Sequence, residues 1–349
     1  MEKIWQEHSI QEIGFLYREV RKMARAELHA GSMDCLKRLR EAGYDAYPVG
    51  GCVRDLLLGR RPGDVDICTA AHPEAVMALF PAAVPTGLKH GTVTVPTPTG
   101  NVEITTFRRE GGYADSRHPD TVAFDAGLRE DLSRRDFTVN AMALGLDGKV
   151  IDPFGGREDL ARKLIRCVGD PDKRFSEDAL RMLRAVRFCA QLGFAMEEGT
   201  AAALRRNASL TEKVSRERLR VEMEKTLLSG RPEEISEMVS AGLLRHLYDF
   251  PAEVDLSGLE KLPPTPEARW RGFCEATGFP ISALPVERKL RRAVEHPELE
   301  VIPTLALTPA DLMALGLRGP QISAAQKKLA LHVLEHPEEN TRESLKDLL

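Results

Sequence analysis

The spacing of apolar residues changes once along this chain, and that change constrains the fold more than any other feature. Between residues 44 and 143, short apolar or alternating runs are separated by glycine and proline, which is typical of strands. After the turn-rich segment DPFGG (152–156), nearly every stretch carries apolar residues at helical spacing. The sequence therefore predicts an α+β protein, in which a small mixed-sheet head is followed by an all-helical neck, body and tail.

The same patterns predict the individual elements and the domain limits. Strands are expected at 46–49, 65–68, 91–95, 102–107 and 121–124, helices at 54–58 and 73–80, and two further helices within residues 2–40. The chain divides into an N-terminal helical appendage (1–30), the head (31–152), the helical neck (153–230), and a helical body and tail (231–349).

Composition argues against two classes of protein. Hydrophobic residues make up 42% and charged residues 29% of the 349 residues, and no apolar run approaches the roughly 18 residues that a membrane span needs. The six cysteines lie far apart with no CxxC pair, which argues against a zinc ribbon and a disulfide framework. No secretory leader is visible. We therefore expect a soluble, cytoplasmic protein that binds no membrane.

The net charge of −4 hides an uneven distribution. Residues 129–231 carry 21 Lys and Arg against 17 Asp and Glu, so a basic middle lies between acidic ends. Such a region suits a channel for polyanions, although solvated helix faces often give the same imbalance. Charge alone therefore leaves the question of a nucleic-acid partner open.

The segment GGCVRDLLLG (50–59) combines a glycine pair with the start of a helix. Gly50 and Gly51 let backbone N–H groups approach a phosphate closely, and the helix that follows directs its positive end at the same anion. Most glycine pairs merely form turns, so this motif indicates a phosphate site only in combination with its neighbours.

The segment GDVDICT (63–69) places two carboxylates, Asp64 and Asp66, at strand spacing. Side chains alternate along a strand, so both would share one face with Cα atoms about 6.6 Å apart. Glu103 supplies a third carboxylate from another predicted strand. Such hard oxygen ligands select Mg²⁺ or Mn²⁺, and three of them can hold two ions about 3.5–4 Å apart. Nucleotidyl transfer is therefore the leading reaction class, and an exposed polar strand face is the simpler alternative.

Eight phrases in order carry a resemblance to a known family: GGCVRDLLLG, GDVDICT, HGTVTV, VEITTFR, SRHPDTVAF, DLSRRDFTVNAMA, DPFGG and EDALRMLRAVRF. Together they resemble the successive motifs of the class II tRNA nucleotidyltransferases, the CCA-adding enzymes, which share a family with bacterial poly(A) polymerases. The agreement in order and spacing extends from about residue 47 to residue 225 and weakens in the tail.

The resemblance implies roles for the head residues. It makes Asp64 and Asp66 the ligands of the metal ions, and Glu103 the residue that completes the catalytic carboxylates. The nucleotide-binding residues that it implies in the head are Gly50, Gly51, Arg54, Arg135 and Asp136. Of these, Arg135 would hold the triphosphate through its bidentate guanidinium, and Asp136 would accept a ribose hydroxyl. The simpler interpretation of the segment RRD (134–136) is a surface salt-bridge cluster.

In the neck, the resemblance gives Asp178 and Arg181 the task of imitating a base-pairing edge. Cytosine and adenine each offer an amino donor beside a ring-nitrogen acceptor, which a carboxylate and a guanidinium can satisfy together. The alternative is an intrahelical ion pair between the two residues. Arg184 and Arg187 are also assigned to the nucleotide site, although each three-residue step rotates about 60° around the helix.

Three other segments add detail. VSRERL (214–219) resembles a motif that braces the base-reading helix, and residues 108–124 resemble a flexible loop that favours enzymes adding A. LGLRGP (315–320) resembles part of the tRNA-contacting tail. His90 and His118 are poor candidates for chemistry, and no HxxxH or HD-type spacing of a metal site is expected.

The resemblance thus implies template-independent addition of C, C and A to the tRNA 3′ end. The expected cofactors are two Mg²⁺ ions, and the expected substrates are CTP and ATP. The expected partner is tRNA, bound through its acceptor stem and 3′ end, and no role for DNA is expected. An A-adding tRNA nucleotidyltransferase and a poly(A) polymerase are the alternatives within the enzyme class. A catalytically silent RNA-binding homologue is the alternative from another class, and its weakness is that it has no reason to keep three repelling carboxylates together.

Overall fold

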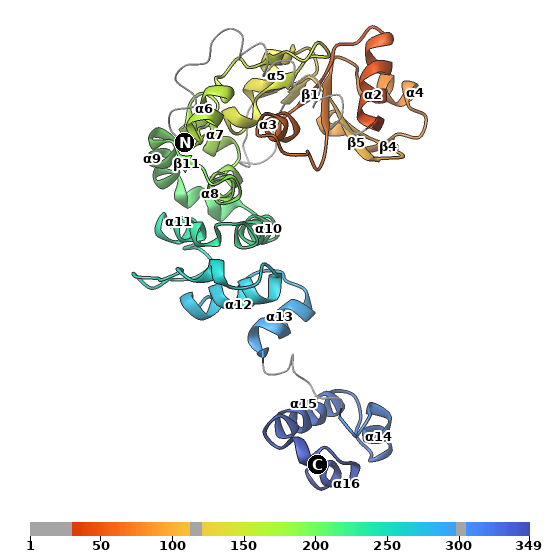
Figure 1. Cartoon of the computed structure of the whole chain (residues 1–349), viewed down its shortest axis with the longest axis vertical. Coiled ribbons are helices and arrows are strands. Elements are labelled where there is room, and N and C mark those ends of the chain that lie inside the picture. Colours follow the sequence, from red (N-terminus) through yellow and green to blue (C-terminus); the bar gives the residue numbers. More distant parts are fainter. Residues whose placement is uncertain (1–29, 112–120, 298–304) are drawn as a thin grey trace. The chain divides into compact units, whose positions relative to one another are not determined.

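The computed structural model describes residues 30–111, 121–297 and 305–349. The chain forms two compact units, Met1–His246 and Leu247–Leu349. Figure 1 shows the first unit beginning with a sheet-bearing head and continuing into helices. The predicted α+β class is therefore confirmed.

The head is built on one seven-stranded mixed sheet. Its strands lie in the spatial order β3 (Val84–Gly87), β4 (Thr92–Thr97), β5 (Gly100–Thr106), β2 (Asp66–Thr69), β1 (Ala46–Val49), β8 (Ala143–Leu144) and β9 (Val150–Ile151). Neighbouring strands are antiparallel except β2 and β5, which run parallel. A separate ribbon pairs β6 (Arg109–Gly111) with β7 (Thr121–Ala123).

Alternation along the central strands separates the two faces of this sheet. Ile67 and Ile104 point to one face and pack in a core cluster with Leu36 of α2 (Ala30–Glu41) and Val76 of α4 (Pro73–Leu79). Cys68 lies on the other face, in a cluster with Leu132 of α5 (Leu128–Ser133). Because side chains alternate along strands, the acidic positions of β2 and β5 lie on the face away from α2 and α4.

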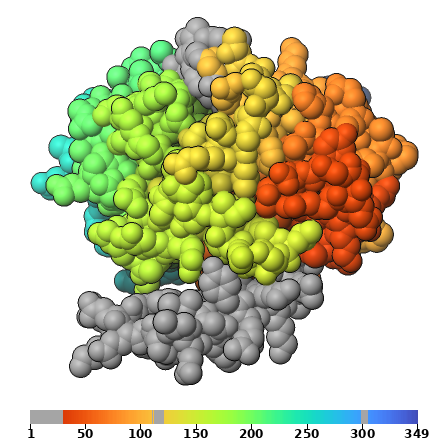
Figure 2. All heavy atoms as spheres, turned by 90° about the horizontal axis from the view of Figure 1, so that it is seen from above, coloured from red at the N-terminus to blue at the C-terminus, as the bar shows by residue number. Residues whose placement is uncertain are grey.

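Helices make up most of the rest of the first unit. The α-helices are α3 (Gly51–Leu57), α6 (Gly156–Arg162), α7 (Pro171–Glu177), α8 (Leu180–Leu192), α9 (Glu198–Arg206), α10 (Arg216–Leu227) and α11 (Ile235–Ser240). The 3₁₀ turns are η1 (Leu88–His90), η2 (Thr138–Asn140), η3 (Ala208–Lys213) and η4 (Pro232–Glu234). Two short strands, β10 (Leu164–Ile165) and β11 (Ala195–Met196), form a parallel pair. Figure 2 shows that the surfaces of the head, in red, orange and yellow, and of the neck, in yellow-green and green, are continuous.

Every secondary-structure element in the described part of the second unit is helical. Its elements are η5 (Leu259–Lys261), α12 (Pro266–Thr277), η6 (Ile281–Ala283), α13 (Arg288–Glu295), α14 (Pro309–Ala314), α15 (Pro320–Glu335), η8 (Pro337–Glu339) and α16 (Arg342–Asp347). Leu312, Leu329, Val333 and Leu345 share one core cluster that joins α14, α15 and α16. None of the described helices combines the length and apolar character that a membrane crossing needs.

Several expectations about single elements need correction. Asp64 lies two residues before β2 instead of inside the strand. Strands β3, β8 and β9 were not predicted, because two-residue strands and the exposed β3 lack an apolar pattern. The predicted appendage, and one of the two helices expected in residues 2–40, fall largely outside the described residues. So does the centre of the predicted loop 108–124, whose described ends pair as β6 and β7.

Candidate active site

Two of the three predicted carboxylates face each other across neighbouring strands. The parallel register of β2 and β5 sets Asp66 directly beside Glu103. Asp64 precedes Asp66 by two residues, and exposure alternates in the expected way: Asp64 and Asp66 are exposed while Val65 between them is buried. The structure therefore brings the predicted acids together on one face of the sheet, at the start of β2 and beside the middle of β5.

The surroundings of Asp66 disfavour its charged form. Burial of the carboxylate among protein atoms raises its pKa, and the negative charges of Glu103 and Asp64 raise it further, while Arg135 acts in the opposite direction. The residue as a whole remains exposed, so the side chain is accessible from one side. Like charges held together in this way are relieved by a bound cation.

Arg135 lies against the glycine pair, as a phosphate site requires. Gly50 has a φ of 76°, and a Cβ atom there would lie 2.8 Å from Nη1 of Arg135. The positive φ explains the glycine, and the short approach shows how closely the guanidinium of Arg135 lies against this turn. Nε of Arg135 is buried and, within the described residues, has no hydrogen-bond partner. A donor is therefore available beside the glycine turn.

Asp131 anchors the two arginines of the RRD segment. Its side chain is completely buried in α5 and accepts hydrogen bonds from Arg134 at 2.8 Å and from Arg135 at 3.5 Å. Burial by itself would lower the pKa of Arg135, but Asp131 and the neighbouring Cys68 and Asp66 raise it above its ordinary value. Arg135 thus stays charged.

A chain of hydrogen bonds connects α3, the helix that follows Gly50, to the neck. Arg54 donates from Nη1 to Oδ1 of Asn140 at 2.8 Å, and Nδ2 of Asn140 donates to Asp136 at 3.2 Å. Arg184 of α8 donates from Nε to the other oxygen of Asp136 at 2.8 Å. Burial acts to raise the pKa of Asp136, but the charge and hydrogen bond of Arg184 outweigh it and lower that pKa to about 2. Asp136 is therefore ionised, and it also accepts the backbone N–H of Phe137 at 2.8 Å.

Phe188 packs among the arginines of this chain. The guanidinium carbons of Arg54 and Arg184 both lie 5.3 Å from the centre of its ring, and that of Arg187 lies at 4.0 Å. The ring also makes an edge contact with Phe137 at 5.7 Å. An aromatic face stabilises nearby cations, so Phe188 helps to hold head and neck side chains in register.

The predicted base-reading pair lies at the start of α8, but its two members bind other residues. Arg218 of α10 donates two hydrogen bonds to Asp178, at 3.2 and 2.8 Å. Arg181 donates to Glu177 at 2.7 Å and to the carbonyl of Arg134 at 3.0 Å. The intrahelical ion pair that was the simpler interpretation is therefore replaced by separate partners. A guanidinium has five N–H donors and a carboxylate about four acceptor sites, so both residues keep capacity for a ligand.

Arg187 contacts the Phe188 ring, but within the described residues no hydrogen bond or ion pair joins it to Arg54, Asn140 or Asp136. It is buried between α8 and α10, where Nη1 donates to Gln191 at 2.7 Å and Nε pairs with Glu222. Burial lowers its pKa, the Glu222 charge raises it, and the net shift is downward. The three-residue step from Arg184 turns the side chain away, as the helical rotation requires. A contact between Arg187 and the nucleotide therefore stays a prediction, and the pairing of Arg187 with Gln191 and Glu222 does not favour it.

Sequence reasoning missed four residues that position the others. Asn140, Asp131, Arg218 and Glu222 lie within or close to the quoted motifs but received no individual role. Arg218 and Glu222 are four residues apart on α10, a spacing that places both on one helix face. Their partners lie on other elements, so the spacing alone did not identify them.

Comparisons with known proteins agree with this geometry. Residues 46–166 match the family described as "Poly A polymerase head domain", and residues 193–252 match "Probable RNA and SrmB- binding site of polymerase A". The CCA-adding enzyme of Geobacillus kaustophilus is 48% identical over 252 residues, which cover 70% of this chain and 62% of the relative. That of Geobacillus thermodenitrificans is 44% identical over 287 residues, covering 80% and 70%.

A solved structure extends the similarity along the chain. The crystal structure of the Bacillus stearothermophilus CCA-adding enzyme in complex with CTP aligns with a TM-score of 0.67 at 34% identity, covering 91% of this chain and 95% of that one. In contrast, the sequence matches to the first curated relatives span about three fifths of those relatives. The two family matches lie within residues 46–252 of this chain.

Proposed function

This chain belongs to the CCA-adding enzyme family, and we propose that it adds C, C and A to the 3′ end of tRNA from CTP and ATP without a nucleic-acid template. The observation that carries this proposal is the register that sets Asp66 beside Glu103, with Asp64 next to them. Three carboxylates on one face, beside a buried arginine donor and a glycine turn, form the parts that nucleotidyl transfer needs.

Two Mg²⁺ ions are the expected cofactors, and the residues present fit them. The carboxylates of Asp64, Asp66 and Glu103 provide hard oxygen ligands, and the raised pKa of Asp66 reflects burial and like charges that a cation would relieve. Asp64 and Asp66 would hold the metal. When bound, such ions make an attacking hydroxyl more nucleophilic and neutralise a leaving pyrophosphate.

The remaining chemistry is assigned to this chain's own side chains. Gly50, Gly51, Arg54 and Arg135 hold the triphosphate, and ionised Asp136 accepts a hydrogen bond from the ribose. Glu103 accepts the proton of the tRNA 3′-hydroxyl while the 3′-oxygen attacks the α-phosphorus of the nucleotide. The new O3′–P bond forms, the bond from the α-phosphorus to the bridging oxygen breaks, and pyrophosphate leaves.

Selection of the base is assigned to Asp178 and Arg181. Arg218 holds Asp178 from one side and Glu177 holds Arg181, so a carboxylate and a guanidinium are presented at fixed positions. Cytosine and adenine match this order of acceptor and donor, whereas uracil and guanine reverse it and leave buried groups unsatisfied at about 1–3 kcal/mol each.

The helical body and tail are assigned to tRNA. In α13, Arg288, Lys289, Arg291 and Arg292 place four cations within eight residues, a density suited to phosphates. We place this activity in the cytoplasm, which fits six cysteines that are all free thiols.

The test uses three tRNA transcripts, ending before CCA, after C and after CC, each incubated with protein, Mg²⁺ and CTP, ATP or both. Stepwise growth that stops at CCA, read at single-nucleotide resolution, is the expected result. Growth of only the CC-ended transcript by one A would assign an A-adding enzyme instead. A long ladder of A would assign a poly(A) polymerase, and no extension would leave a silent RNA-binding homologue.

A further inference from the structure

A group of histidine and glutamate side chains lies at the end of α15, within the second unit. His332 and His336 stand four residues apart in the segment HVLEH, a spacing that places two imidazoles on one helix face. Their ring centres are 4.9 Å apart. Sequence analysis overlooked this spacing when it set the histidines aside.

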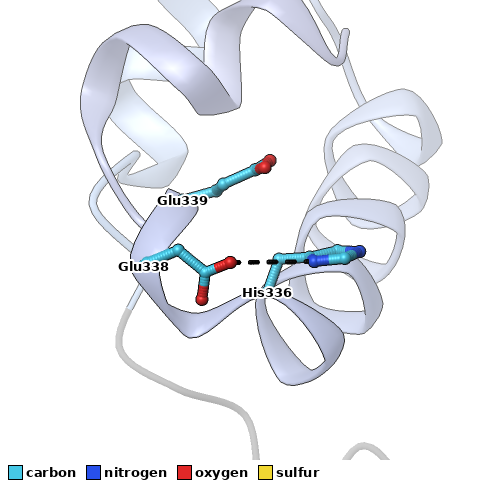
Figure 3. A group of neighbouring side chains, drawn as sticks. All are labelled: His336, Glu338 and Glu339. Carbon is cyan, nitrogen blue, oxygen red and sulfur yellow. Dashed lines mark ion pairs between the residues drawn. The ribbon is translucent and has the colours of Figure 1, made fainter.

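The turn that follows brings two carboxylates to the same place. Pro337 starts η8 immediately after α15, and this turn directs Glu338 and Glu339 back toward His336 (Figure 3). Ligand atoms of His336, Glu338 and Glu339 all lie within 4.8 Å of one another. Nε2 of His332 is 2.6 Å from Oε2 of Glu339. Three potential ligands therefore converge, and His332 adds a fourth candidate beside one of them, Glu339.

We propose that this group, formed by His332, His336, Glu338 and Glu339, binds a divalent transition-metal ion of the Zn²⁺ type. Two imidazole nitrogens and one or two carboxylate oxygens suit Zn²⁺, which prefers nitrogen together with oxygen or sulfur in a four-coordinate site. The donor set differs from the all-carboxylate set of the head, which suits Mg²⁺. The two sites thus discriminate between metals by ligand chemistry.

The position of the site indicates a structural role. Val333, between the two histidines, packs in the core cluster shared with Leu312 and Leu345. Just after Glu339, Oδ1 of Asn340 accepts a hydrogen bond from the backbone N–H of Ala306 at 2.9 Å. An ion held by α15 and η8 would therefore fix the turn that joins these packed segments. A metal that binds the folded unit more tightly than the unfolded chain stabilises it.

Without an ion, the same side chains form simple ion pairs near the C-terminal end of a helix, where positive charge is favoured. His332 with Glu339 and His336 with Glu338, at 3.8 Å, can be explained in that way. The two interpretations differ in one measurable property, since only a metal site links all four residues to the binding of one ion.

The experiment is a titration of the metal-stripped full chain with Zn²⁺, and separately with Co²⁺, in excess Mg²⁺ to occupy the head carboxylates. We expect one ion per chain, a Co²⁺ visible spectrum typical of four-coordinate nitrogen and oxygen ligands, and a rise in the unfolding temperature of the second unit, followed through buried Trp270 fluorescence. His336→Gln and Glu339→Gln should each weaken binding by about tenfold or more, by analogy with other metal-site substitutions.

Two controls separate this site from other ligands. Glu335→Gln alters an exposed carboxylate on the same helix outside the group and should bind Zn²⁺ like the parent chain. His336 is exposed, so its replacement by Gln should leave the far-ultraviolet circular dichroism unchanged. Equal Zn²⁺ affinity in the parent chain and in His336→Gln, or no stoichiometric binding, would overturn the proposal. Neither result would bear on CCA addition, which is measured without Zn²⁺.

Discussion

The three clustered carboxylates of the head and the charged side chains of the neck are held in opposite ways. In the head, Asp64, Asp66 and Glu103 lie together, and within the described residues no salt bridge connects any of them to a cation. In the neck, each charged side chain of the base-reading helix has a partner: Asp178 with Arg218, Arg181 with Glu177, Arg184 with Asp136, and Arg187 with Glu222.

This difference indicates two kinds of work. Repelling carboxylates are unfavourable in the free protein and gain from a cation, so their arrangement is typical of a site that binds metal. Paired side chains are already satisfied, and their pairing fixes the orientation of the donors and acceptors that remain. Under the proposed function, the head carboxylates would serve chemistry and the neck side chains recognition, so substitutions in the two regions should have different effects.

The largest expected effect comes from Asp66→Asn. The amide keeps the shape of the side chain but removes a charged ligand, so transfer of both C and A should fall by roughly a thousandfold or more, equivalent to about 4 kcal/mol of activation free energy. The measurement is the initial rate of extension on the three transcripts, with circular dichroism to follow the fold.

The control for this experiment is Asp147→Asn, which alters an exposed carboxylate in the turn between β8 and β9. This variant should extend the transcripts like the parent chain. If Asp66→Asn slowed one nucleotide and spared the other, the carboxylates would act in recognition, and the contrast between head and neck would fail.

The next largest effect is expected from Arg181→Ala. This change removes the predicted donor of the base edge while Glu177 keeps its ion pair with Arg174. Discrimination against UTP and GTP should fall by roughly 10- to 100-fold, because mismatched bases then leave fewer unsatisfied groups. The readout is the ratio of kcat/KM for CTP to that for UTP.

Arg205→Ala is the matched control, since Arg205 forms an exposed ion pair with Glu237 on the neighbouring helix. It should leave the ratio unchanged. Full discrimination in Arg181→Ala would disprove the base-edge account.

The head was the more predictable region for a physical reason. Strand alternation placed Asp64 and Asp66 on one face from sequence alone, because that rule is local. The partnership of Asp66 with Glu103 depends on which strands become neighbours. The sequence suggested Glu103 as a third carboxylate on another strand, but only the structure gives the register that sets the two side by side. Strand β8 was missed because its two residues carry no pattern, although it pairs with β1 beside the glycine turn.

The neck was less predictable because its contacts are between elements. Helical periodicity identified α8 and α10, but it cannot say that Arg218 reaches Asp178 across 40 residues of sequence. Similarly, Arg187 was assigned to the nucleotide with Arg184, although rotation around the helix turns it toward Glu222. Spacing within one helix specifies a face, whereas the partner on that face is set by tertiary packing.

A pH experiment sharpens the comparison where the two regions meet, at Asp136. Arg184 and Asn140 hold the pKa of Asp136 at about 2 against an ordinary value of 3.8, in spite of its burial. A depressed carboxyl pKa contributes stability that is present above about pH 4 and is lost as the pH falls through 2. The contribution is about 2 kcal/mol.

The measurement compares the free energy of unfolding by urea in the parent chain and in Asp136→Asn across this pH range. The difference between the two should be largest above pH 4 and shrink by about 2 kcal/mol toward pH 2. A difference that stays constant with pH would show that Arg184 does not stabilise the ionised carboxylate.

The smallest effect, and the most specific, is expected from Arg218→Met. Methionine keeps much of the side-chain length without the two hydrogen bonds to Asp178, which retains the backbone N–H of Leu180 at 3.1 Å. Arg218 acts on the base only through Asp178, so discrimination against UTP and GTP should fall by about tenfold, less than in Arg181→Ala. The rate with CTP should fall less than discrimination does.

Arg220→Met provides the matched control on the same helix, because Arg220 pairs only with Glu217 and Glu224 of α10 among the ion pairs of the described residues. It should change neither rate nor discrimination. If Arg218→Met slowed all four nucleotides equally, the pairing in the neck would serve stability alone. A change confined to the choice of base would instead establish that a residue with no predicted contact to the nucleotide governs selection through the orientation of Asp178.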